Sequence, residues 1–350
     1  MRKSGVFFFA IAAITLSLII WGRSIPQFIA GFNPAVSIEL PADSAPTGLD
    51  LTVDAKQLLD HVYAIAKPRY SNEQKTVARQ YIIDQLANYG VTATAQPYGP
   101  AETGSELEGT NLLAEIPGSD AAAGAIVLGA HYDTVENSPG ADDNASAIAT
   151  LIEAARIFSS GPSRATLKLV FFDQEEHQPD NSGLLGSLAY VQSEEARDVR
   201  GAVILDMVGY ACRDAGCQSY PPRLPIQNLP ETGDFLAVLG LNTHTDLIGA
   251  FVLSAQQHWP LVLSLPIPER LVGLFPDLVR SDHAPFWEKD IPAVFVTDTA
   301  NYRNPNYHTP RDLPATLDTS FLTGSAQHVV NAIATLLNQS PQPQNQPAQS

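Results

Sequence analysis

The chain has 350 residues, of which 45% are hydrophobic, so it can form one large folded domain or two smaller ones and is not globally disordered. Its formal net charge of −17 disfavours nucleic acid as a partner, because phosphate binding requires clustered lysine and arginine. The two cysteines, Cys212 and Cys217, do not form a CxxC pair, which argues against a cysteine-based zinc site.

The first segment, residues 1–23, is predicted to be a membrane anchor or a signal segment. Arg2 and Lys3 precede an uncharged stretch from Gly5 to Gly22, which is barely long enough to span a membrane. Gly22-Arg23-Ser24 is a poor cleavage site, so an uncleaved anchor is favoured over a cleaved signal peptide and over a core helix. The positive charge at the N-terminus favours an extracytoplasmic body, either membrane-anchored or secreted or periplasmic after cleavage.

A linker and two helices are expected next. Residues 24–52 are rich in Pro, Ala and Ser and are predicted to be a linker. The first helix has apolar residues at helical spacing, namely Leu58, Leu59, Val62 and Ile65. The second is expected to begin near Asn72 and to end before Gly90, since glycine tolerates the left-handed conformation that follows a helix. The apolar residues of this second helix are Val77, Tyr81, Ile82 and Leu86.

Apolar runs further along the chain predict strands that alternate with helices. The strands are expected at 111–116, 125–130, 167–172, 202–205 and 292–297. Helices are expected at 145–158, 184–192, 245–257 and 318–337, the last with Asp318 or a following Thr or Ser as its N-cap. This alternation predicts an α/β fold with a mixed, largely parallel central sheet and helices on both faces.

The remaining segments complete the predicted domain organisation. Residues 53–338 are expected to form one catalytic domain. Within it, residues 210–279 are rich in proline and less regular, and they are interpreted as a lid or pocket region or, equally, as an ordinary surface excursion. Residues 339–350, rich in Gln and Pro, are predicted to be a disordered tail. If the body lies outside the cytoplasm, a Cys212–Cys217 disulfide is chemically reasonable, but the spacing does not decide between a disulfide and two thiols.

Side chains that bind metals stand at the ends of the predicted strands. Open α/β sheets place their chemistry at the carboxyl ends of strands, and a zinc hydrolase needs nitrogen and oxygen ligands that leave a position open for water. The sequence therefore predicts a two-zinc hydrolytic site. One zinc ion is assigned to His131 and Asp206, the other to Glu176 and His308, and Asp143 to both; Glu175 is the predicted general base and Asp133 the partner that orients His131.

The segments that carry these residues resemble those of a known group. They are His-Tyr-Asp-Thr-Val, Pro-Gly-Ala-Asp-Asp-Asn-Ala-Ser, Phe-Phe-Asp-Gln-Glu-Glu, Leu-Asp-Met-Val-Gly and Tyr-His-Thr-Pro-Arg-Asp. Together they resemble the co-catalytic zinc exopeptidases of metallopeptidase family twenty-eight (MH clan), from about residue 111 to 313. The resemblance implies a phosphorylase/hydrolase-like zinc exopeptidase fold and the same ligands, and it selects Asp143 as the bridge because Asn144 follows. It also implies that Tyr307 stabilises the oxyanion.

The chain departs from the family pattern in places. Ala147 stands where many relatives have glycine, which removes no ligand. The insert His-Gln-Pro-Asp-Asn-Ser between Glu176 and Gly183 is interpreted as a solvated loop, although it could instead form a pocket rim that includes His177. Residues 210–279 match the family only loosely, so the sequence does not reveal which residue the enzyme prefers.

The leading functional hypothesis is an aminopeptidase with two Zn²⁺ per chain that hydrolyses N-terminal residues of peptides. A carboxypeptidase or dipeptidase on the same core is a second hypothesis. A pocket that binds the terminal carboxylate of a substrate typically requires arginine, and arginines are present in the relevant region. Arginines in or beside the irregular region are Arg213, Arg223, Arg270 and Arg280. A glutaminyl cyclase-like acyltransferase, which uses a single zinc, and a non-catalytic binding ectodomain are two further hypotheses. The sequence does not indicate the oligomeric state.

Overall fold

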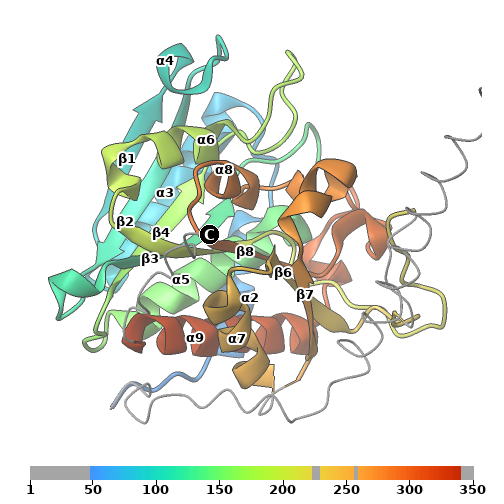
Figure 1. Ribbon diagram of the computed structural model, residues 1–350. Helices are drawn as coiled ribbons and strands as arrows, with labels where there is room; N and C mark the ends of the chain where they lie inside the picture. The colour runs from blue at the N-terminus through green and yellow to red at the C-terminus, as the bar shows by residue number, and fades with distance from the viewer. Residues whose placement is uncertain (1–47, 223–228, 256–258, 340–350) are drawn as a thin grey trace, which may run out of the picture.

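The computed structural model describes residues 48–222, 229–255 and 259–339. In this part of the chain, eight strands form one sheet in the order β1-β2-β4-β3-β5-β8-β6-β7 (Figure 1). The strands are β1 (Ala93–Tyr98), β2 (Gly109–Ile116), β3 (Ala125–His131), β4 (Thr166–Phe172), β5 (Val199–Leu205), β6 (Phe235–Leu241), β7 (Leu261–Ile267) and β8 (Ala293–Thr297). Strands β4, β3, β5 and β8 are parallel, and so are β6 and β7. The pairs β1–β2, β2–β4 and β6–β8 are antiparallel, so the predicted mixed, largely parallel sheet is confirmed.

Helices cover both faces of the sheet, as predicted (Figure 1). The α-helices of the described residues are α2 (Ala55–Ile65), α3 (Asn72–Asn88), α4 (Pro100–Thr103), α5 (Ala147–Phe158), α6 (Leu185–Gln192), α7 (Thr245–Ala255), α8 (His283–Glu288) and α9 (Thr319–Asn338). Shorter helical turns are η1 (Ala121–Ala123), η2 (Ala141–Ser146), η3 (Glu194–Ala196), η4 (Glu269–Leu274), η5 (Pro276–Val279), η6 (Ala300–Tyr302) and η7 (Pro314–Thr316). Helices α2, α3, α5, α7 and α9 bury the larger apolar core, and α6 and α8 bury a second one on the opposite face. Strand β3 is buried along its whole length, because a central parallel strand is covered on both sides.

Local sequence signals determine where helices begin and end. Ser71 starts α3 with a capping box, in which its hydroxyl accepts the N–H of Gln74 and the Gln74 side chain accepts the N–H of Ser71. Gly90 follows this helix with φ of 72°, as predicted. Helix α9 begins after Asp318, as predicted. Of the apolar residues that predict α3, however, Val77 is 67% exposed and contributes nothing to the core.

Residues 210–279, which were predicted to be less regular, contain more secondary structure than the one expected helix. This segment contains β6 and β7 in addition to the expected helix, α7, whose last predicted residues lie outside the described part. Strand β1 was also not predicted. Both β1 and β7 contain a proline, Pro97 and Pro266, which argues against a strand in general. They form the two edges of the sheet, where a missing N–H is tolerated.

The predictions for the two ends of the chain fall mostly on residues that the structure does not describe. The anchor or signal segment 1–23, residues 24–47 of the linker and residues 340–350 of the tail lie outside the described ranges. Among the residues that are described, no helix is both long enough and apolar enough to cross a membrane.

Candidate functional site

Three predicted site segments lie at the carboxyl ends of neighbouring strands. His131 is the last residue of β3, Glu175-Glu176 lie just beyond β4, and Asp206 directly follows β5. Gln174 and Met207 both have φ of 57°, a left-handed conformation that is uncommon for residues other than glycine. The chain therefore turns sharply after β4 and β5. These turns bring the carboxylates of Glu175, Glu176 and Asp206 close to the carboxyl end of β3.

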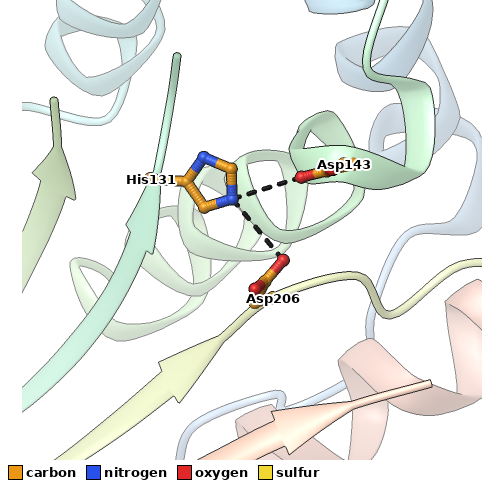
Figure 2. Close-up of side chains that lie close together, drawn as sticks. All are labelled: His131, Asp143 and Asp206. Carbon is orange, nitrogen blue, oxygen red and sulfur yellow. Dashed lines mark ion pairs between the residues drawn. The ribbon is translucent and has the colours of Figure 1, made fainter. Parts of the chain in front are cut away.

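The first group of predicted ligands combines one histidine with two aspartates. Asp143 lies in η2, the turn before α5, with φ of −107° and ψ of 83°, which are not helical values. Figure 2 shows the His131 ring pointing between Asp143 and Asp206. Its Nε2 lies 3.3 Å from Oδ1 of Asp143 and 3.5 Å from Oδ1 of Asp206.

The second group shares Asp143 with the first. Nε2 of His308 lies 3.2 Å from Oδ2 of Asp143 and 3.0 Å from Oε1 of Glu176. In each group the three donor atoms lie within 4.8 Å of one another. Asp143 therefore contributes one oxygen to each group, and the structure brings all five predicted ligands together.

Asp133 connects His131 with the segment that follows β4. Its Oδ1 lies 3.5 Å from Nδ1 of His131 and accepts the N–H of Glu175 at 3.1 Å. Its Oδ2 accepts the N–H of Glu176 at 3.3 Å. The carboxylate is buried. It lies close enough to orient the imidazole, and its two hydrogen bonds fix the backbone of both glutamates.

Asn144 was not predicted to have a role of its own. Its side-chain amide donates to the carbonyl oxygen of Leu205 at 2.9 Å and accepts the N–H of Met207 at 3.1 Å. These two residues flank Asp206, so Asn144 fixes the backbone of one predicted ligand from the position next to another, Asp143. Its place directly after the predicted bridge is the signal that could have identified it.

The carboxylates of the site are buried, which changes their acidity. Burial raises the pKa of Glu175 well above its ordinary value and that of Glu176 to about 7. Burial also acts to raise the pKa of Asp143, but the neighbouring imidazoles of His131 and His308 outweigh it and lower the pKa. A buried group with more carboxylates than cationic partners attracts cations.

The residues fit a pair of divalent metal ions. Nε2 of His131 and Oε1 of Glu176 are buried without a hydrogen bond of ordinary geometry among the described residues. Each atom belongs to one of the two ligand groups, so a cation bound there would supply the partner that the atom lacks. Mixed imidazole and carboxylate donors suit zinc.

A cavity of about 410 Å³ opens onto the two ligand groups and is also lined by Glu175. Its floor is the face of β6, β7 and β8, because lining residues alternate along these strands. The apolar floor includes Ala237, Leu239, Leu263, Leu265, Ile267 and Phe295. His177, from the insert after Glu176, is exposed and lines the same cavity, so the insert is both solvated and part of the rim.

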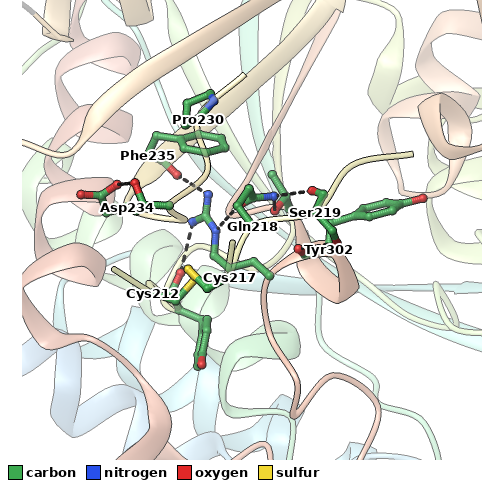
Figure 3. The surroundings of a disulfide bond; sticks show 12 residues. Cys212, Cys217, Gln218, Ser219, Pro230, Asp234, Phe235 and Tyr302 are labelled. Atoms are coloured by element: carbon green, nitrogen blue, oxygen red, sulfur yellow. Dashed lines mark hydrogen bonds between the residues drawn. A yellow bond between two sulfur atoms is a disulfide. The ribbon is translucent and has the colours of Figure 1, made fainter. Parts of the chain in front are cut away.

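The segment that follows the two cysteines contributes Ser219, Tyr220 and Pro221 to the cavity lining. Figure 3 shows the surroundings of the cysteines. Cys212 and Cys217 form a disulfide, which the sequence left undecided. Gln218 directly follows Cys217, and its side-chain oxygen accepts a hydrogen bond from Nε of Arg303 at 2.8 Å. Arg303 also donates to the carbonyl oxygen of Phe235 at 2.8 Å. These contacts connect the disulfide loop to the start of β6, and the next residues of the loop line the cavity.

Arginines that were candidates for carboxylate binding differ in location. Arg280 lines the cavity. Arg213 is exposed, pairs with Asp318 at 2.6 Å and is absent from the described lining, as is Arg270. Arg223 lies outside the described residues.

The chain is similar to known proteins both in its sequence and in its fold. The family described as Peptidase family M28 matches residues 111–232 and 265–334. The chain is 32% identical over 308 residues to the uncharacterized protein YfbL of Escherichia coli (strain K12), covering 85% of this chain and 89% of YfbL. It is 29% identical over 199 residues to aminopeptidase YwaD of Bacillus subtilis (strain 168), covering 53% of this chain and 35% of YwaD. The structure of BSAP, a zinc aminopeptidase from Bacillus subtilis, has the same fold, with a TM-score of 0.62, 16% identity and coverage of 81% and 95%.

Proposed function

The chain belongs to peptidase family M28, and we propose on this basis that it is a zinc-dependent aminopeptidase that removes N-terminal residues from peptides. The observation that carries the proposal is the pair of ligand groups that share Asp143 beside a cavity lined by Glu175. The similarity to aminopeptidase YwaD supports the choice of an aminopeptidase within the family.

We assign two zinc ions to the two ligand groups. His131 and Asp206 would hold one ion, Glu176 and His308 the other, and Asp143 both. Zinc bound here supplies Lewis acidity, which makes a water molecule easier to deprotonate and a peptide carbonyl easier to attack.

Glu175 is the proposed general base. It lines the cavity, is 9% exposed, and has its backbone fixed by Asp133. Its carboxylate takes a proton from the attacking water and later gives that proton to the amine of the departing peptide. Tyr307, which lines the same cavity, donates a hydrogen bond to the carbonyl oxygen as that oxygen becomes negative.

The cavity floor supports a preference for apolar N-terminal residues. The faces of β6, β7 and β8 that form it are apolar, and a pocket of this kind binds a side chain by removing apolar surface from water. A volume of about 410 Å³ accommodates large aliphatic and aromatic side chains.

The contacts of Arg280 favour an aminopeptidase over a carboxypeptidase. Arg280 lines the cavity, but its Nη1 already donates to Asp277 at 3.3 Å and to Asn301 at 2.8 Å. Its Nη2 donates to the hydroxyl of Tyr307 at 3.1 Å. Both terminal nitrogens are therefore engaged by the protein, whereas a receptor for a C-terminal carboxylate presents a free guanidinium.

We further propose that residues 53–338 are the catalytic domain and that this domain acts outside the cytoplasm. The Cys212–Cys217 disulfide supports this location, because disulfides persist in oxidising compartments. The charge pattern of residues 1–23 supports export, with the N-terminal segment either retained as an anchor or removed.

One experiment tests the proposed activity directly. The purified protein is incubated with a short peptide that begins with leucine and with the N-acetylated form of that peptide, each with and without a zinc chelator. We expect chelator-sensitive cleavage of the free peptide alone. Cleavage of both peptides would contradict an aminopeptidase. Cyclisation of a peptide with N-terminal glutamine, without cleavage of the leucyl peptide, would identify an acyltransferase instead.

A further inference from the structure

The contact between Arg280 and Tyr307 is not explained by metal binding or by the apolar pocket. The Tyr307 ring stacks on the imidazole of His308, with ring centroids 3.7 Å apart and an angle of 19° between the planes. This stacking fixes the position of the phenol oxygen. It does not fix the direction of the O–H bond, because a phenol hydroxyl rotates about its C–O bond.

Arg280 restricts that rotation. Its Nη2 donates to the Tyr307 oxygen at 3.1 Å, and its guanidinium carbon lies 6.0 Å from the ring centroid. A guanidinium group has donors only, so the phenol oxygen must be the acceptor in this contact. The proton of Tyr307 is therefore directed away from Arg280. Both side chains line the cavity that Asp143 and Glu175 also line.

The guanidinium group is itself fixed by two other segments. Asp277, in η5, and Asn301, in η6, accept hydrogen bonds from Nη1. The hydroxyl of Tyr302 donates to the same Asp277 oxygen at 2.7 Å, which fixes the carboxylate. The Arg280 side chain is 39% exposed, so these contacts, rather than burial, determine its orientation.

We propose that Arg280 is a positioning residue that directs the Tyr307 hydroxyl proton into the cavity, toward the carbonyl oxygen of the substrate. This inference rests on the proposed aminopeptidase function. Arg280 acts through Tyr307 and does not itself contact the reacting atoms. With the phenol oxygen already accepting from Arg280, the hydroxyl does not have to reorient when negative charge develops on the substrate, which is the condition for effective stabilisation of an oxyanion.

A double-mutant cycle tests the proposal with leucine 4-nitroanilide, which has a free amine and no carboxylate. The variants are Tyr307→Phe, Arg280→Met and the double variant. Tyr307→Phe is expected to lower kcat by about 10²- to 10³-fold, the usual effect of losing an oxyanion donor. Arg280→Met should lower kcat about tenfold with little change in KM. The double variant should be no slower than Tyr307→Phe, because Arg280 then has no hydroxyl to position.

Two further variants sharpen the test. Arg280→Lys should recover part of the lost kcat, because lysine can still donate one hydrogen bond, although without the planar fork of arginine. Arg197→Met serves as the control and should leave kcat and KM unchanged, because Arg197 lies in an exposed pair with Glu194. Zinc content and circular dichroism are compared for every variant.

The possible outcomes separate the two proposals. If the wild-type protein does not cleave the nitroanilide with zinc present, the proposed function fails. If it does and Arg280→Met slows Tyr307→Phe by a further tenfold, the two residues act independently and the positioning role is wrong. The positioning role would also be wrong if Arg280→Met raised KM only for dipeptides with a free C-terminal carboxylate, because Arg280 would then bind that carboxylate.

Discussion

The carboxylate of Asp312 accepts the backbone N–H of Asp143 at 3.1 Å, across 169 residues of sequence. Its other oxygen accepts the N–H of Asp142 at 3.0 Å. Asp312 is fully buried and lies just after His308 in the chain. One side chain therefore connects the turn that carries the proposed bridging ligand with the segment that carries the last ligand.

The first prediction concerns this connection. In Asp312→Asn, one of the two buried N–H groups loses its acceptor and faces an amide N–H₂ instead. We expect zinc affinity to fall by about 10- to 100-fold, as is usual when a residue that supports a ligand is changed. Competition with a chromogenic chelator measures this affinity. Asp60→Asn, an exposed position in α2, is the control. An unchanged affinity in Asp312→Asn would show that the Asp143 turn holds its conformation unaided.

The second prediction concerns Glu175. Glu175→Gln keeps the size of the side chain and removes its ability to accept a proton, so kcat should fall by about 10²- to 10⁴-fold. The zinc content should remain at the wild-type value, since Glu175 belongs to neither ligand group. Steady-state kinetics and metal analysis of the same sample measure both quantities. The exposed Glu194→Gln is the matched control. Activity near the wild-type value would exclude Glu175 as the base.

How much of the site the sequence predicts depends on how far apart the interacting residues lie. His131, Glu175, Glu176 and Asp206 could be identified because each follows an apolar run that forms a strand, and strand ends are visible in the sequence. The supporting contacts of Asn144 and Asp312 join segments that are distant in the chain, which no local pattern encodes. The pairing of Arg280 with Tyr307 is of the same kind.

The fold shows the same division. Strands β3, β4, β5 and β8 were predicted because burial on both faces makes them continuously apolar, as in β3. Strand β6 is also apolar and lies inside the sheet, but it was not predicted, since it falls in the proline-rich segment that was interpreted as less regular. The edge strands β1 and β7 were not predicted either, because each contains a proline, Pro97 or Pro266, that only an edge position tolerates. The apolar floor of the cavity is built partly on β7, so the segment that shapes the pocket is also the one that the sequence described least well.

The third prediction concerns the size of the pocket. Ala237 is buried in β6 and lines the cavity floor, so Ala237→Leu should reduce the space for the N-terminal side chain of the substrate. We expect kcat/KM for a phenylalanyl substrate to fall by about 10- to 100-fold relative to that for an alanyl substrate. Ala87→Leu, at an exposed position of α3, is the control for the added volume. Equal losses for both substrates would indicate a general disturbance of the core rather than a smaller pocket.

The fourth prediction concerns the pH dependence of folding. His283 is buried between Trp287 and Phe295, with ring centroids 4.6 Å away on each side, and it contacts the carbonyl oxygen of Leu278 at 2.8 Å. Burial lowers its pKa from 6.5 to about 4. Because the pKa is lower in the folded state, protonation favours the unfolded chain. The stability is fully present above about pH 6.5 and is lost progressively as the pH falls toward 4.

The gap between these two pKa values corresponds to about 3 kcal/mol of unfolding free energy. The variant His283→Gln lacks the titrating imidazole, so its unfolding free energy lacks this part of the pH dependence. The stability difference between the wild-type protein and this variant should therefore shrink by about 3 kcal/mol between pH 7.5 and pH 4. Urea unfolding of chelator-treated protein at a series of pH values measures the difference, which excludes effects of metal loss. His177→Gln, which removes an exposed histidine, should keep a constant difference from the wild type. A constant difference for His283→Gln as well would mean that the pKa of His283 is the same in the folded protein as in the unfolded chain, with water or a carboxylate reaching its ring.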